Sequence, residues 1–153
     1  MKVKFERKQA NLELPLLSVH EWPCADCGAR LVLVLVNGQP VYQCEMKYST
    51  GCKGIASAHP NGQPLGIPID AEGRALRSLL HGLIDPYWVK QQDKKAARKQ
   101  VYDFMHRQMG DTVVEHPDGS ETIIFSFHVS YLLHEDLKHA IAIAQDELRK
   151  EFG

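Results

Sequence analysis

Four cysteines constrain this chain more than any other feature, because all of them fall within residues 24–52 of a 153-residue sequence. They are spaced as C-x2-C, an interval of sixteen residues, and C-x7-C, at Cys24, Cys27, Cys44 and Cys52. In a reducing compartment, clustered thiols indicate metal or redox chemistry and not disulfides. Two residues between thiolates let both sulfurs reach one ion, and Gly28 permits the positive φ that such a turn needs. The first pair is therefore a zinc-knuckle sequence.

The interval between the two cysteine pairs predicts a β-hairpin. Alternating leucine and valine at Leu31–Val36 are followed by Asn37-Gly38 and by a second β-rich run. Asn-Gly between such runs is a strong hairpin signal, and the hairpin brings Cys44 back beside the first knuckle. Four thiolates then surround one tetrahedral Zn²⁺ and leave no open position, so we expect one structural and not catalytic ion.

Two other uses of four cysteines stay open at this point. A thioredoxin-like C-x-x-C is followed by a helix within a βαβ unit, whereas a strand is expected here. An iron–sulfur cluster also takes four cysteines. The Cys44-x7-Cys52 spacing fits a widened second knuckle at least as well, and His59 is not needed as a ligand. We therefore predict a four-cysteine zinc ribbon.

The ribbon segment resembles the small zinc ribbons at the C-terminal end of bacterial type I topoisomerases, which are associated with single-stranded DNA binding. The residues that carry the resemblance are Cys24-x2-Cys27-Gly28-x2-Leu31, the hairpin, and Tyr42-x-Cys44-x7-Cys52-Lys53-Gly54. The resemblance implies one zinc ion and a nucleic-acid partner.

A longer resemblance spans roughly residues 20–150. Its motifs are Ala58-His59-Pro60-x-Gly62-x-Pro64-Leu65-Gly66, Arg74-x2-Arg77, His81 and Asp85-Pro86-x-Trp88. Together with the ribbon they resemble a phage and prophage family described only as a zinc-finger-containing domain of unknown function. That likeness implies zinc and a phage setting, hence the cytoplasm of a bacterial host, and implies no activity.

Composition describes an ordinary soluble chain. The formal net charge is −1 and the pI is near 6.7. Proteins that rely on nonspecific phosphate contacts are usually basic overall, so a nucleic-acid role here needs a local patch. The longest apolar run, Leu31–Val36, is far short of the about 20 residues of a membrane helix, and the first residues lack the apolar core of a secretory signal. We expect no membrane contact and a cytoplasmic location.

The chain divides into four expected segments. These are a lead segment at 1–19, the zinc ribbon at 20–58, a Pro/Gly connector at 59–69 and a body at 70–153. Leu12–Leu17 in the lead suits an edge strand or a docking segment, because Pro15 argues against a central strand. The expected fold class is α+β: a small four-cysteine zinc ribbon, made of a β-hairpin with two knuckles, attached to a mostly helical body with a short β-hairpin.

Hydrophobic periodicity and capping residues predict the elements of the body. One helix begins after Asp70, a good N-cap, and ends at Asp85-Pro86. Its apolar stripe is expected to contain Leu76, Leu79, Leu80, Leu83 and Ile84. Two more helices are expected over Asp93–Met109 and about Glu135–Phe152, with β-segments around Val113-Val114 and over Thr122–Val129.

Two groups of residues are candidates for contact with nucleotides, because single strands are held by stacking plus electrostatics. The ribbon contributes Arg30, Lys47, Tyr48 and Lys53, and the second helix contributes Lys94, Lys95, Arg98 and Lys99. The charge run on that helix is also typical of a solvated face. Tyr42 is as well explained by packing across the hairpin.

A third polar row lies on the first helix. Arg74, Arg77, His81 and Asp85 recur at i, i+3, i+7 and i+11, so they share one face. Such a row is typical of an exposed helix face, and the alternative is a phosphate- or acid-binding face with His81 oriented by Asp85. No nucleophile, P-loop or deaminase pattern accompanies these histidines, so we expect no enzyme.

The leading hypothesis is a zinc-binding, nucleic-acid-binding protein, of phage origin and preferring single-stranded DNA. The alternative is a protein-interaction module that binds and modulates a host protein, since closed zinc ribbons serve both kinds of contact.

Overall fold

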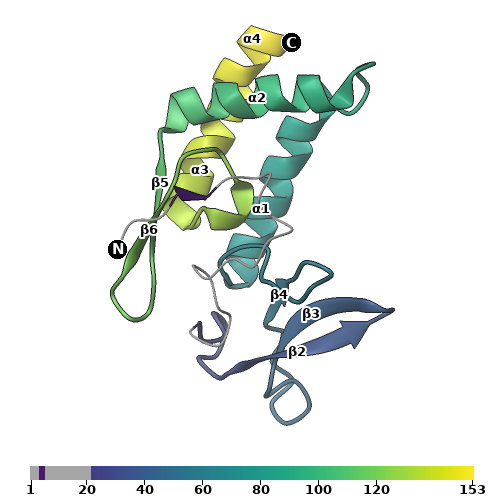
Figure 1. The fold of residues 1–153 in the computed structure, drawn as a ribbon, viewed down its shortest axis with the longest axis vertical. Helices are drawn as coiled ribbons and strands as arrows, with labels where there is room; N and C mark the ends of the chain where they lie inside the picture. Colours follow the sequence, from purple (N-terminus) through teal and green to yellow (C-terminus); the bar gives the residue numbers. More distant parts are fainter. Residues whose placement is uncertain (1–3, 6–21) are drawn as a thin grey trace.

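The computed structural model describes residues 4–5 and 22–153, and it places two sheets at different ends of a helical body (Figure 1). The predicted segment Leu12–Leu17 lies outside the described residues. The mixture of helix and sheet agrees with the expected α+β class. Within the described residues, no helix is long and apolar enough to cross a membrane.

The cysteine-bearing segment forms one of the two sheets. It contains β2 (Leu31–Val36), β3 (Gln39–Cys44) and β4 (Ile55–Ser57), all antiparallel, in the order β2-β3-β4. Asn37 and Gly38 adopt φ values of 53° and 78°, as a two-residue type I′ turn requires. The predicted hairpin is confirmed, and its register pairs Leu31 with Cys44.

The helices of the body are α1, α2 and a C-terminal helix in three parts. Their bounds, with the short 3-10 segments between them, are α1 Ala71–Ile84, η3 Asp85–Tyr87, α2 Lys94–Met109, η4 Val129–Tyr131, α3 His134–Ile143, η5 Ala144–Leu148 and α4 Arg149–Phe152. Asp70 caps α1 by accepting a hydrogen bond from the Gly73 amide, and Gly110 ends α2 with a φ of 79°. The C-terminal helix, predicted as one regular element, contains a π-helical turn at η5.

The second sheet contains β5 (Thr112–Glu115), β6 (Glu121–Ile124) and β1 (Lys4–Phe5), in the order β1-β6-β5. The prediction of a strand over Thr122–Val129 was wrong at its C-terminal end. Thr112 pairs with Ile124, and α2 ends just before it, so β5 has no further backbone to pair with residues after Ile124. Phe127 and Val129 instead enter the helical core.

The main core lies between α1, α2 and the C-terminal helix. Its fully buried side chains include Leu80, Ile84, Met105, Leu137 and Leu148. Leu79, predicted on the apolar stripe of α1, is instead half-exposed. A narrower face of α1 therefore packs into the core than the leucine pattern predicts.

Candidate metal centre and the adjoining cleft

The four cysteine sulfurs converge at the base of the β2–β3 hairpin. All four Sγ atoms lie within 4.8 Å of one another. The Cys24–Cys52 and Cys27–Cys44 sulfurs are 3.8 Å and 3.3 Å apart, which excludes disulfides, whose S–S distance is about 2.05 Å. A tetrahedral ion with bonds of about 2.3 Å holds its sulfurs about 3.8 Å apart. The cluster therefore has the dimensions of a site for one metal ion.

Local backbone geometry forms both knuckles. In the first, Gly28 has a φ of 83° and its amide donates to the Cys24 carbonyl at 2.8 Å. In the second, the Met46 amide lies 3.4 Å from Cys44 Sγ. An amide directed at a sulfur favours the thiolate form, which is the form that binds metal.

Electrostatics makes the cluster dependent on a cation. Burial, together with hydrogen bonds from the three neighbouring thiols, raises the pKa of the Cys44 thiol to about 12, against the opposing effect of the Met46 amide. Without a cation, the Cys44 thiol therefore holds its proton. Metal binding must release that proton, because only a thiolate acts as a ligand.

Gly54 is a residue of this site that sequence reasoning missed. A Cβ added at Gly54 would lie 2.1 Å from Cys24 Sγ and 3.4 Å from Cys44 Cβ. Only glycine lets the backbone that enters β4 pass this close to the sulfurs. The sequence signal was the glycine two positions after Cys52.

Asp26, inside the first knuckle, was also missed, and it joins the metal cluster to the helical body. Its Oδ1 accepts a hydrogen bond from the Ala71 amide, and its Oδ2 pairs with Arg74, both at 2.9 Å. The knuckle thus supplies a second carboxylate, besides Asp70, to the N-terminal turn of α1. No local sequence pattern shows a contact over 45 residues.

The candidate nucleotide-contacting residues of the ribbon lie on its surface. Tyr48 is 90% exposed, and the Lys47 ammonium lies 5.5 Å from the centre of its ring. Lys53 is exposed, and Arg30 forms a surface ion pair with Glu45 at 3.2 Å. Tyr42, in contrast, is buried and donates from its hydroxyl to the Gly62 carbonyl at 2.6 Å, which confirms that it packs in the ribbon.

The helix α2 lies at the opposite end of the molecule from the β2–β3 hairpin (Figure 1). Lys94 and Lys95 are exposed at the start of the helix. Arg98 lies 4.0 Å from the ring centre of Tyr102, and Lys99 pairs with Asp103. Two of the four predicted contact residues on α2 therefore already have intramolecular partners.

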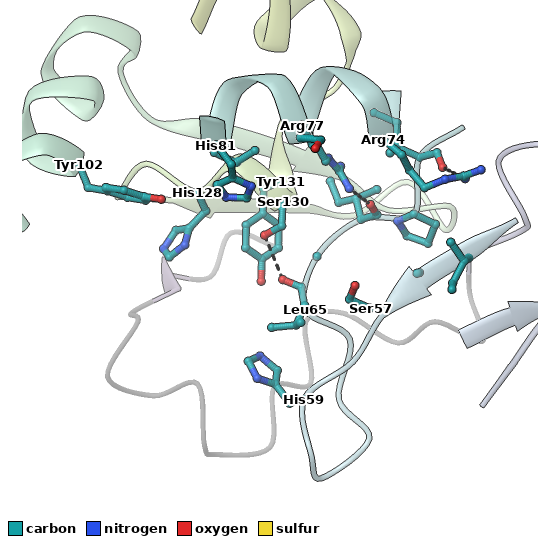
Figure 2. A pocket seen from close by; sticks show the side chains of 18 of the residues that line it. Ser57, His59, Leu65, Arg74, Arg77, His81, Tyr102, His128, Ser130 and Tyr131 are labelled. Carbon is teal, nitrogen blue, oxygen red and sulfur yellow. Dashed lines mark hydrogen bonds between the residues drawn. The ribbon is translucent and has the colours of Figure 1, made fainter. Parts of the chain in front are cut away.

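The polar row of α1 borders a cleft of about 610 Å³ between the ribbon and the body. Figure 2 shows Arg74, Arg77 and His81 on the α1 side and His59 on the opposite side. Asp85 does not line the cleft; it accepts a hydrogen bond from the Trp88 indole at 3.1 Å. The proposed orientation of His81 by Asp85 therefore has no hydrogen bond to support it within the described residues.

Comparisons of the chain with protein-family models, with curated proteins and with solved structures found nothing that matches it. The function is therefore inferred from the geometry of the cysteine cluster and its surroundings.

Proposed function

We propose that this protein is a zinc-ribbon protein that binds single-stranded DNA. The metal site is carried by the convergence of four cysteine sulfurs within 4.8 Å. The DNA-binding role is carried by Tyr48, which is 90% exposed on the loop between the third and fourth cysteines. The phage setting follows from the sequence resemblance alone.

Zinc is the metal that the ligand set favours. Four cysteine sulfurs and no oxygen or nitrogen ligand suit a soft or borderline ion, and a closed tetrahedral set of this kind is typical of structural zinc. Two carboxylates are adjacent to cysteines in the chain: Asp26 is held by Ala71 and Arg74, and Glu45 pairs with Arg30. Because all four ligand positions belong to the protein, the ion stabilises the ribbon and has no position for a substrate.

Metal analysis of the purified protein tests this assignment. We expect one zinc and no iron per chain. Cys44→Ser should abolish stoichiometric zinc and unfold the ribbon, whereas Ser49→Ala in the same loop should keep the zinc. Full zinc content and unchanged thermal stability in Cys44→Ser would show that the ligand set is wrong.

Single-stranded DNA is the partner that the loop suits best. An exposed aromatic ring stacks on any base, and base–aromatic stacking contributes about 1–3 kcal/mol per base. Lys47 and Lys53, on either side of Tyr48 in the chain, supply charge for the backbone phosphates. Unstacked bases are accessible only in single strands, so duplex DNA is expected to bind more weakly.

Fluorescence anisotropy with the zinc-loaded full chain tests the proposal. We compare labelled single-stranded DNA, duplex DNA and RNA over a salt series. We expect the single strand to bind, and the logarithm of its binding constant to fall linearly with the logarithm of the salt concentration. Tyr48→Ala should weaken binding about tenfold or more. A second variant, Lys47→Ala, removes one of the proposed phosphate contacts. Its matched control is Lys138→Ala, which removes an exposed lysine from α3. No binding of any nucleic acid at low salt would refute the proposal.

The second candidate function is a protein-interaction module. It is favoured by the apolar side chains that β2 exposes: Leu35 is 73% exposed, and Leu33 and Val36 are also open to solvent. Leu35→Lys should leave the fold and DNA binding intact, and it should abolish any protein complex that uses this surface.

A further inference from the structure

The cleft between the ribbon and the body carries an excess of positive charge. Among the residues that the structure describes, three arginines and three histidines line it and no aspartate or glutamate does: the six are Arg74, Arg77, Arg98, His59, His81 and His128. The chain as a whole has a net charge of −1. The local charge of the cleft is therefore opposite to that of the protein, as a site for an anion requires.

Arg77 is the group in this cleft that most needs an anion. Its guanidinium donates to the Ile67 carbonyl at 2.7 Å and the Leu132 carbonyl at 3.1 Å, and its buried Nε has no hydrogen-bond partner among the residues described. Among the ion pairs of the described residues, none includes Arg77. Burial lowers its pKa to about 10, which reflects the cost of a desolvated charge without a counter-ion.

Arg74 shows what Arg77 lacks. One helical turn earlier on α1, Arg74 has a carboxylate partner in Asp26 at 2.9 Å and also donates to the Ile69 carbonyl. Within the described part of the chain, the acceptors of Arg77 are two neutral carbonyls. Both arginines border the cleft, and they differ in charge compensation.

We infer that this cleft binds a phosphate group, and that the phosphate belongs to the single strand held by the ribbon. The identity of the anion rests on the proposed function; the need for an anion does not. The volume of about 610 Å³ is within the roughly 300–1,000 Å³ of small-ligand sites. Guanidinium and hydroxyl groups such as those of Arg77 and Ser78 are ordinary donors to phosphate oxygens.

The path from the ribbon to the cleft is short in the chain. Lys53 follows the fourth cysteine directly, and β4 begins two residues later. Ile55 and Ser57 of β4 then form part of the cleft lining, and Figure 2 shows Ser57 there. The segment that carries Tyr48 and Lys53 is thus continuous in the chain with the wall of the cleft that faces Arg77.

The test places a carboxylate in the cleft without touching the buried arginine. Ser78 lines the cleft and is exposed on α1, so Ser78→Glu can fold. The matched control is Ala75→Glu, which is exposed on the same helix and does not line the cleft. Each variant is titrated by anisotropy with labelled dT12 and by calorimetry with dTMP, after its thermal unfolding has been checked.

We expect Ser78→Glu to weaken dT12 binding about tenfold and to make the salt dependence shallower by about 0.7, the slope of one phosphate contact on a single strand. Ala75→Glu should change the affinity less than threefold. Equal effects of the two variants would overturn the inference, while Tyr48→Ala would still test the ribbon.

The dTMP arm separates failure of the inference from failure of the proposed function. If dT12 does not bind but dTMP does, and Ser78→Glu abolishes dTMP binding, the cleft is a phosphate site for a free nucleotide and the DNA-binding function is wrong. If dT12 binds and is insensitive to Ser78→Glu, the function stands and the cleft inference is wrong. If neither dT12 nor dTMP binds, both are wrong.

Discussion

Gly54→Ala should selectively destabilise the metal-bound protein. The new Cβ would lie 2.1 Å from Cys24 Sγ, against an optimal separation of about 3.5–4.0 Å between nonbonded carbon atoms. One of the two groups must move by well over 1 Å, whereas metal–ligand distances hold within about 0.2 Å. Cys44 Cβ at 3.4 Å and Asp26 at 3.3 Å limit movement in other directions.

The magnitude follows from the cost of overpacking. Inserting a methyl group into a packed site costs about 1–3 kcal/mol, and the upper end applies here because a bound sulfur cannot rotate away. We therefore expect the free energy of unfolding to fall by about 3 kcal/mol with zinc, and the zinc affinity to fall by about 100-fold. Without zinc the Cys24 side chain can rotate, so the free energy of unfolding of the metal-free protein should change by less than about 1 kcal/mol.

Urea unfolding with and without zinc, and competition with a chromogenic chelator, measure these quantities. Gly82→Ala is the matched control, because no atom lies within 4 Å of its added Cβ and the position is in the interior of α1. There the same substitution should stabilise the protein by about 0.5–1 kcal/mol. A Gly54→Ala protein that binds zinc within threefold of the original affinity would refute the placement of Cys24 beside β4.

Three further results are expected. Asp26→Ala should lower the free energy of unfolding by about 1–2 kcal/mol, since the Ala71 amide and Arg74 both lose an acceptor, and metal analysis should still find one zinc. The pKa of Asp70 is lowered by the Gly73 amide first and then by His134; its contribution to stability is therefore present above the ordinary carboxyl pKa and is lost as the pH falls through the folded value. In Asp70→Asn the unfolding temperature should therefore fall less between pH 5 and pH 3 than in the original protein. The same dependence of unfolding temperature on pH in both proteins would contradict this. Zinc binding near pH 7 should release the proton that the raised pKa keeps on Cys44; calorimetry in buffers of different ionisation enthalpy measures this, and a heat independent of the buffer would contradict it.

Local chemistry was enough to predict much of the fold. The Asn37-Gly38 turn, the Asp70 cap and the Gly110 stop each depend on residues within a few positions, and each is found where the sequence places it. The gathering of the cysteines followed from the hairpin, because its register pairs Leu31 with Cys44. Features that depend on residues close together in the sequence were therefore predictable.

Features that depend on distant neighbours were not. β6 ends at Ile124 because its last partner, Thr112, is the first residue of β5. The alternation of apolar and polar residues after Ile124 does not reveal where the partner strand begins. The row on α1 was interpreted first as an exposed helix face, yet Arg77 is largely buried and donates to the carbonyls of Ile67 and Leu132. Both outcomes are decided by tertiary packing, which one-dimensional spacing does not contain.

The metal centre and the cleft depend on one another through two of the unpredicted residues. Asp26 ties the first knuckle to the N-terminus of α1, the helix that carries Arg77. Gly54 lets the chain pass the sulfurs and enter β4, which forms part of the opposite wall. A metal ion bound by the four sulfurs would therefore hold parts of both walls of the cleft at once. A closed, non-catalytic metal site can in this way set the geometry of a binding site that it does not itself touch.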